Sequence, residues 1–179
     1  MCNNRIWFGR GGARLLALCG LCLGAQAVAN ELPKESVLPL KLAVQTALYA
    51  QQQCAQDGYR VSVSVVDRAG VLTALVRGDG AGPHTVDSSR RKAYTAASLR
   101  ARTQELADLV SQTPELQALG DMNDSILLLG GGFPVNIGGE VVGGIGVGGA
   151  PGIALDEACA RAGLKHIGAN TYQTAPESK

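Results

Sequence analysis

The sequence predicts an α+β fold in which helices pack on one five-stranded antiparallel sheet. Segments whose apolar residues have helical spacing flank segments that alternate with period two. The strand-like segments follow one another after links of only two or three residues. Such links join antiparallel strands, because a parallel crossover needs a dozen or more residues. The predicted order is α-ββ-αα(α)-βββ-α.

The first half of the chain supplies a helix and a hairpin. Residues 38–58 have helical spacing, with Pro39 in the first turn and Gly58 just beyond the end. Residues 59–67 alternate valine with serine, as a strand with one buried face does. Residues 71–77 run back as its hairpin partner.

The second half supplies the remaining helices and strands. Helical patterns cover residues 86–102, a short segment at 115–120 and a last helix at 154–164. Thr113 followed by Pro114 is typical of a helix start. The three predicted strands are 125–129, 133–137 and 140–148.

The strand 140–148 has one face of almost bare backbone, at Gly144, Gly146 and Gly148. Glycine inside a strand often marks close approach by another backbone or by a ligand. Either a helix or a neighbouring subunit packs on this face, or Gly144 and Gly146 line a slot for a flat ligand. Gly144, Gly146 and Gly149 match a dinucleotide fingerprint only weakly, since its strand-to-helix context and downstream acid are missing.

Residues 1–29 have the three-part pattern of a secretory signal peptide, with cleavage after Ala29. A mitochondrial transit peptide is the alternative. We expect residues 30–179 to form a single domain that is periplasmic or secreted. Without the leader's three arginines, 13 basic residues face 15 acidic ones and no polybasic run exists, which argues against a nucleic-acid partner. No second apolar segment is long enough to span a membrane.

Two of the five cysteines, Cys54 and Cys159, lie in the expected mature chain. Two cysteines in an exported domain favour one disulfide, here between the first and last helices. Closing a loop of about 105 residues stabilises by about 4–5 kcal/mol in the chain-entropy model. Two buried free thiols are the alternative.

Four segments form a recognisable set: "VSVVDRAGVLTALVRGDGAGPHTVDSSRRKAYTAASLR", "GGFPV", "GEVVGGIGVGGAPG" and "DEACARAGL". Together they resemble the GlcG/HbpS-like family of haem-binding proteins and the C-terminal domain of PduO-type corrinoid adenosyltransferases, over about residues 38–168. The resemblance implies a profilin-like fold, haem or a related tetrapyrrole as ligand, and a homo-oligomer. It also implies an iron contact from a threonine before the central helix, which by position is Thr85.

His84 is a second candidate iron ligand, because imidazole is a common axial ligand of haem; a solvated or capping histidine is the alternative. Arg90, Arg91 and Lys92 can bind haem propionates, since cationic side chains pair with carboxylates. Consecutive helical residues point about 100° apart, so the three cannot all face one ligand. The i, i+4 spacing predicts that Asp87 pairs with Arg91 and leaves Arg90 for the anion.

These features predict an exported accessory protein that binds, senses or carries haem or a related tetrapyrrole, rather than a fast enzyme. An enzyme of oxidative haem breakdown or of small-metabolite turnover is one alternative, and a ligand-free oligomeric adaptor is another. A hydrolase is not indicated, because Ser88 and Ser89 lack the G-x-S-x-G context of a nucleophile elbow.

Overall fold

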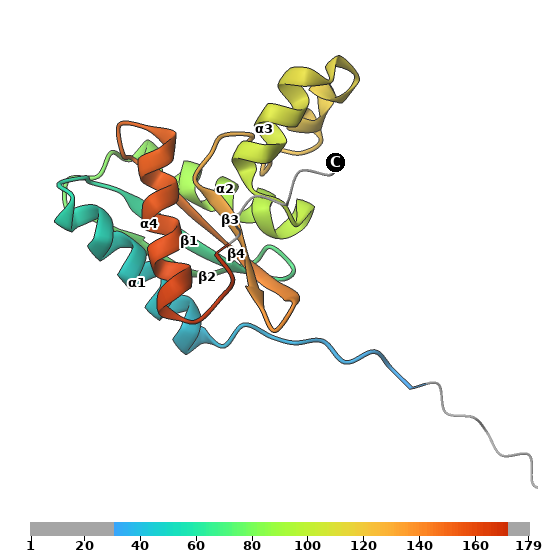
Figure 1. Ribbon diagram of the computed structural model, residues 1–179, viewed down its shortest axis with the longest axis horizontal. Helices are drawn as coiled ribbons and strands as arrows, with labels where there is room; N and C mark the ends of the chain where they lie inside the picture. Colours follow the sequence, from blue (N-terminus) through green and yellow to red (C-terminus); the bar gives the residue numbers. More distant parts are fainter. Residues whose placement is uncertain (1–30, 172–179) are drawn as a thin grey trace, which may run out of the picture. The chain divides into compact units, whose positions relative to one another are not determined.

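Four β-strands form one antiparallel sheet in the computed structural model, which describes residues 31–171. The strands are β1 (Ser62–Asp67), β2 (Leu72–Arg77), β3 (Gly132–Ile137) and β4 (Glu140–Gly148), in the order β2-β1-β4-β3. The helices are α1 (Leu40–Gln56), α2 (His84–Leu99), α3 (Thr103–Gln112), the 3₁₀ helix η1 (Pro114–Asp121) and α4 (Ile153–His166) (Figure 1). All of them belong to one compact unit that begins at Glu35. The proposed leader lies outside the described residues.

The fifth strand, predicted at residues 125–129, does not form, and the described part of the chain has four strands. The backbone of this segment forms hydrogen bonds with side chains of α2 and does not pair with a neighbouring strand. Thr95 Oγ1 accepts the N–H of Leu127 at 2.8 Å, and Arg91 donates to the carbonyl of Ile126 at 2.6 Å. Ile126 is buried. The prediction was wrong because an extended segment buried against a helix has the same apolar run as a strand.

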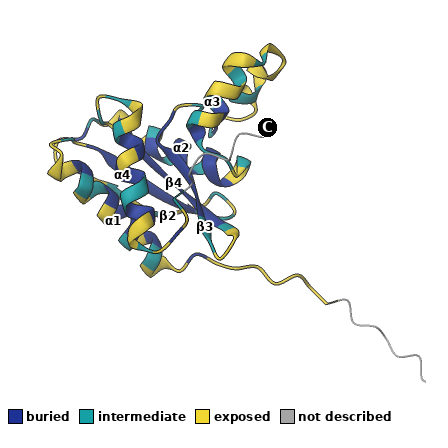
Figure 2. Ribbon diagram, in the orientation of Figure 1, coloured by how far each residue is buried: buried dark blue, intermediate teal, exposed yellow. Residues whose placement is uncertain are grey.

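Helices cover both faces of the sheet (Figure 1). Val63 and Val65 of β1 and Ile145 of β4 face the core that α1 and α4 complete with small side chains. The alternate residues face α2, as the period-two pattern predicts. Figure 2 shows most of β1, β3 and β4 as buried, whereas the edge strand β2 is intermediate or exposed along its length.

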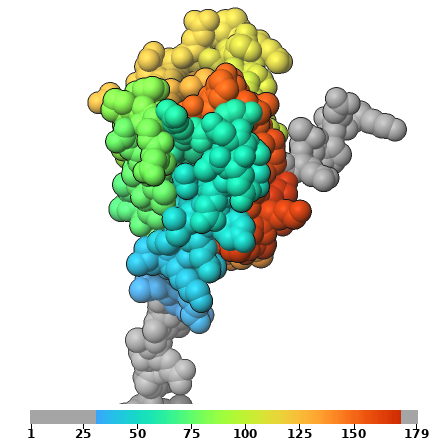
Figure 3. Space-filling model, turned by 90° about the vertical axis from the view of Figure 1, so that its left-hand side faces the viewer, coloured from blue at the N-terminus to red at the C-terminus, as the bar shows by residue number. Residues whose placement is uncertain are grey.

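A disulfide between Cys54 and Cys159 joins α1 to α4, as the sequence predicts. The two Cα atoms are 5.5 Å apart. The helices approach closely because Gly163 has no side chain: a Cβ there would lie 2.5 Å from the carbonyl oxygen of Thr46. Figure 3 shows α1 in cyan and α4 in red adjoining on the surface. None of the helices in residues 31–171 is long and apolar enough to cross a membrane.

Candidate functional site

A cleft of about 370 Å³ lies between α2, the loop after β4 and the first turns of α4. Residues 148–152 form one wall, and His84, Ser88 and Lys92 of α2 form the opposite one. Leu129 and Ile153 add apolar surface. A volume of this size falls within the range of about 300–1,000 Å³ that is typical of small-molecule sites.

The three cleft residues of α2 lie on one face of the helix, because they are four residues apart. With a rise of 1.5 Å per residue, His84 and Lys92 are separated by about 12 Å along the helix axis. His84 is exposed at the helix start, whereas Lys92 is only 2% exposed. The cleft therefore has an imidazole at one end and an ammonium group at the other.

The glycines of β4 determine how closely α2 lies on the sheet. A Cβ on Gly144 would collide with the carbonyl oxygen of Ala93, and one on Gly146 with that of Ser89. Both collisions involve helix backbone, so neither can be relieved by moving a side chain. The helix α2 therefore covers the bare face of the strand. Of the two interpretations of these glycines, close helix packing is the one that the structure supports, and not a slot for a flat ligand. Gly144 and Gly146 do not line the cleft and act on it only through the position of α2.

Two buried hydroxyl pairs fix the rotation of α2 on β1. Thr85 Oγ1 lies 2.7 Å from Ser62 Oγ, and Ser89 Oγ lies 2.8 Å from Ser64 Oγ. Thr85 also donates to the carbonyl of Gly82 at 2.6 Å and is 2% exposed. The structure therefore turns the Thr85 hydroxyl toward the sheet and does not bring it to the cleft, whereas its neighbour His84 lines the cleft.

The two arginines predicted to meet an anion turn away from the cleft. Arg90 pairs with Asp87 at 3.0 Å and donates to Ser125 Oγ at 3.4 Å. Arg91 donates to the carbonyl of Ile126. The predicted Asp87–Arg91 pair was wrong. Arg91 donates instead to Ile126 in the segment that follows η1, and Asp87 pairs with Arg90, its i, i+3 neighbour.

The inner end of the cleft contains a buried ion pair that the sequence analysis did not predict. Lys92 Nζ lies 2.9 Å from Asp156 Oδ2 and donates to the carbonyl of Val147 at 2.9 Å. Asp156 Oδ1 accepts the N–H of Ala150 at 3.0 Å. Burial raises the pKa of Asp156 above its ordinary value, although Lys92 and the backbone N–H groups of the loop act in the opposite direction.

Gly131 makes room for this ion pair. A Cβ on Gly131 would lie 2.9 Å from Asp156 Cβ and 3.0 Å from Lys92 Nζ, and the φ of Gly131 is +110°. Any other residue here would be strained and would push the two charged side chains apart.

Sequence reasoning missed most of the cleft wall that lies beyond α2. The i, i+4, i+8 spacing of His84, Ser88 and Lys92 is a signal that could have grouped these three. Asp156, Leu129 and Ile153 have no such spacing in the sequence, because only the tertiary fold brings them near α2. The residues that were missed as parts of the cleft are Ser88, Leu129, residues 148–152, Ile153 and Asp156.

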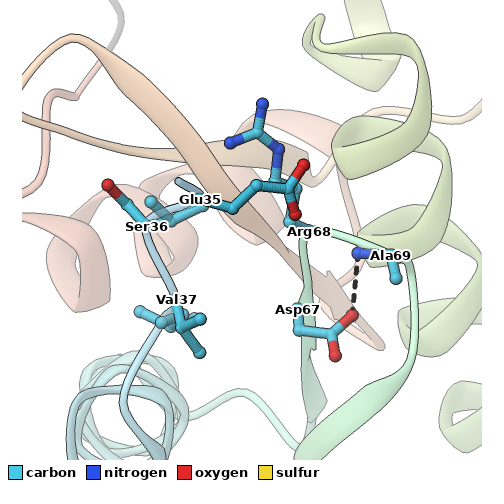
Figure 4. Close-up of a pocket in the computed structure, with 8 residues that line it drawn as sticks. Glu35, Ser36, Val37, Asp67, Arg68 and Ala69 are labelled. Carbon is cyan, nitrogen blue, oxygen red and sulfur yellow. Dashed lines mark hydrogen bonds between the residues drawn. The ribbon is translucent and has the colours of Figure 1, made fainter. Parts of the chain in front are cut away.

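A second hollow, of about 130 Å³, lies where residues 35–38 pass the turn between β1 and β2 (Figure 4). Asp67 Oδ1 there accepts the N–H groups of Ala69 and Val71, each at 2.9 Å. This carboxylate therefore serves to hold the turn. The hollow is smaller than typical ligand sites, whereas the cleft beside His84 falls within their range.

Comparison with known proteins agrees with this fold. Protein GlcG of Escherichia coli is 31% identical over 111 residues, which are 62% of this chain and 81% of GlcG. The crystal structure of a double mutant of HbpS from Streptomyces reticuli has 41% identity and a TM-score of 0.72, and covers 88% of this chain and 98% of HbpS. The crystal structure of the PduOC:heme complex has 27% identity and a TM-score of 0.70, over 77% of this chain and all of PduOC.

The family model described as haem degrading protein HbpS-like matches residues 38–165. This match runs from just before α1 almost to the end of α4 and includes every strand and every cleft residue. The chain therefore belongs to the HbpS-like family.

Proposed function

We propose that the chain binds haem in the cleft, with the imidazole of His84 as an axial ligand of the iron. The observation that carries this proposal is that an exposed imidazole lines the same cleft as an apolar rim. The family description and the haem complex of PduOC, a structural relative, support the choice of haem.

The residues of the cleft fit such a ligand. Leu129 and Ile153 are 41% and 39% exposed, and Pro151 is exposed beside them. A flat apolar macrocycle would remove these side chains from water, which is favourable by about 25 cal/mol per Å² of apolar surface. Within residues 31–171, no hydrogen bond holds the His84 imidazole, so its ring nitrogens are available to a metal. Haem would supply the iron, and the protein would supply its axial ligand and a partly apolar pocket.

A haemin titration followed by absorption spectroscopy tests this function. We expect a saturable Soret band at about one haem per chain, and we expect His84→Ala to shift or abolish it. His166→Ala is the matched control, because His166 lies at the far end of α4, stacked on Tyr49. An unchanged spectrum in His84→Ala, or equal losses in both variants, would contradict the role of His84.

We further propose that the protein is exported and acts as an accessory protein that binds, senses or carries haem. The disulfide supports an oxidising compartment, because such bonds are rare where thiols are kept reduced. The N-terminus of the protein recovered from its host tests export. A chain that begins near Asn30 is expected, and an intact Met1 would contradict it.

A homo-oligomer is part of the same proposal. Leu40, Val44 and Leu48 are exposed at i, i+4 and i+8 on α1, and exposed apolar patches are typical of interaction surfaces. Light scattering of the purified chain should give a mass of more than one copy. A monomer at micromolar concentration would contradict this part.

Oxidative breakdown of haem is the second candidate function, because the family description itself names haem degradation. Its test adds a reductant and oxygen to the haem complex. A Soret band that decays faster than that of free haemin would favour an enzyme, and a stable band would favour a carrier or sensor.

A further inference from the structure

We propose that the inner end of the cleft is a carboxylate-binding subsite formed by the Lys92 ammonium and the Ser88 hydroxyl. The two residues line the same cleft one helical turn apart on α2. The subsite is separate from His84, which lies one turn further toward the start of the helix.

Both groups have donor capacity that the fold does not use. An ammonium group has three N–H donors. Lys92 gives one to Val147 and one to Asp156, and the described residues provide no third acceptor. Among residues 31–171, the Ser88 hydroxyl has only a contact of 3.4 Å with the carbonyl of Thr85, which is long for a hydroxyl donor.

The Asp156 carboxylate at this end of the cleft already has a donor on each of its oxygens. Asp156 Oδ2 accepts from Lys92, and Oδ1 accepts from the N–H of Ala150. Its negative charge is thus balanced inside the protein, and the third N–H of Lys92 and the hydroxyl of Ser88 remain as donors. A carboxylate accepts hydrogen bonds and donates none when ionised, so it is the complementary group.

Glycines give the two donors their positions. A Cβ on Gly146 would lie 2.9 Å from Lys92 Cβ, so the lysine side chain passes directly over this bare strand residue. A Cβ on Gly148 would lie 2.8 Å from Ser88 Oγ. A side chain at Gly148 would displace the Ser88 hydroxyl directly, whereas one at Gly146 would displace Lys92 through the backbone of α2, which gives part of the glycine strand a role at the subsite.

Two sources can supply the carboxylate. One is an acidic side arm of the tetrapyrrole that His84 would hold, since His84 and Lys92 are about 12 Å apart along α2, and this source rests on the proposed function. The other is a free organic acid that enters the cleft without haem. The chemistry of recognition is the same for both.

The experiment uses the purified chain with its disulfide intact and three probes: haemin, haemin dimethyl ester and sodium succinate. The ester keeps the iron and the macrocycle but has no ionised carboxylate. If the tetrapyrrole supplies the carboxylate, haemin should bind about 10-fold more tightly than the ester, since hydrogen bonds to charged groups are the stronger kind. If a free acid supplies it, succinate should saturably shift the amide resonances of residues 148–152 in the absence of haem.

Two variants assign either effect to the subsite. Ser88→Ala keeps the buried ion pair and should lower the preference for haemin, or the affinity for succinate, by about threefold. The double variant Lys92→Met/Asp156→Asn removes both charges and should abolish the effect. Lys165→Met is the matched control for a lost positive charge, because Lys165 is exposed near the end of α4, outside the cleft lining. If the double variant does not fold, Ser88→Ala alone decides.

The outcomes separate this proposal from haem binding itself. Equal binding of haemin and its ester, without any response to succinate, would overturn the subsite and leave haem binding intact. A response to succinate without any haem binding would support the subsite and overturn the proposed function. Effects that persist unchanged in Ser88→Ala and the double variant would also overturn the subsite.

Discussion

Lys92 Nζ and Asp156 Oδ2 lie 2.9 Å apart although the two residues belong to helices on opposite faces of the sheet. The lysine side chain passes the beginning of β3, where Gly131 has no side chain in the way. Both side chains are at most 6% exposed. The pair therefore joins the two helical layers around the edge of the sheet, and its energetics can be tested.

Removing one partner of this pair should be costly. Lys92→Met leaves a buried carboxylate without its cation, which should lower the free energy of unfolding by about 3–5 kcal/mol. Lys92→Met/Asp156→Asn should recover a large part of that loss, because the substituted amide is neutral and its oxygen can still accept from the N–H of Ala150. Denaturant unfolding of the single and double variants measures the coupling, and additive losses would show that the two side chains do not act as a pair.

The raised pKa of Asp156 predicts a dependence of stability on pH. The unfolded chain titrates this group near its ordinary value of 3.8, and the folded chain titrates it at a higher pH. Between these two values the folded state binds more protons, so the contribution of Asp156 is fully present below pH 3.8 and is lost as pH rises through the folded pKa. The difference in unfolding free energy between the wild type and Asp156→Asn should therefore fall as pH rises across this window. A difference that grows with pH would contradict the direction of the shift.

Gly146→Ala should unfold the protein more readily rather than merely weaken ligand binding. Its Cβ would meet the backbone of α2, and overpacking of this kind costs about 1–3 kcal/mol or more. Gly120→Ala is the matched control, since Gly120 lies in η1 outside the cleft lining and its Cβ would have Leu128 Cδ1 as its nearest contact, at 3.6 Å. Thermal melts and haemin titrations of both variants would separate the packing role of the strand from a ligand slot. If Gly146→Ala had normal stability but no longer bound haem, the glycine face would line a ligand slot after all.

The disulfide should make a measurable contribution to stability. Replacing both Cys54 and Cys159 by alanine should lower the free energy of unfolding by about 2–5 kcal/mol. Mass analysis of the unreduced protein should show two hydrogens fewer than the dithiol form. Two free thiols in that measurement, or an unchanged stability in the double variant, would contradict the bridge or its role.

Periodicity predicted most of the regular elements of this fold, but it gave no range for α3 (Thr103–Gln112). The alternation in β1 reflects the two faces of the strand: Val63 and Val65 face the core, and the hydroxyls of Ser62 and Ser64 form hydrogen bonds with hydroxyls of α2. It failed at residues 125–129, where a helix and not a strand covers the apolar run. Periodicity also extended α2 too far, because the helix ends at Leu99 and the next residue, Arg100, has a φ of 53°, a conformation that glycine normally adopts.

The candidate site was less accessible to sequence reasoning. His84 was identified by its chemistry, and the structure places it in the cleft between α2 and α4. Asp156 was not identified, because its partner is 64 residues away and the pairing depends on how the chain returns after β4. Thr85 and Arg91 have suitable chemistry, but tertiary hydrogen bonds turn both of them elsewhere.

The bond between Cys54 and Cys159 closes a covalent ring that includes all four strands, α2 and α3. A protease that cuts once inside this ring opens a loop but releases no fragment. The two pieces would stay connected until the bond is reduced, and α1 and α4 would remain in register on the sheet. A protein built in this way can be cut once inside the ring and still keep α1 beside α4.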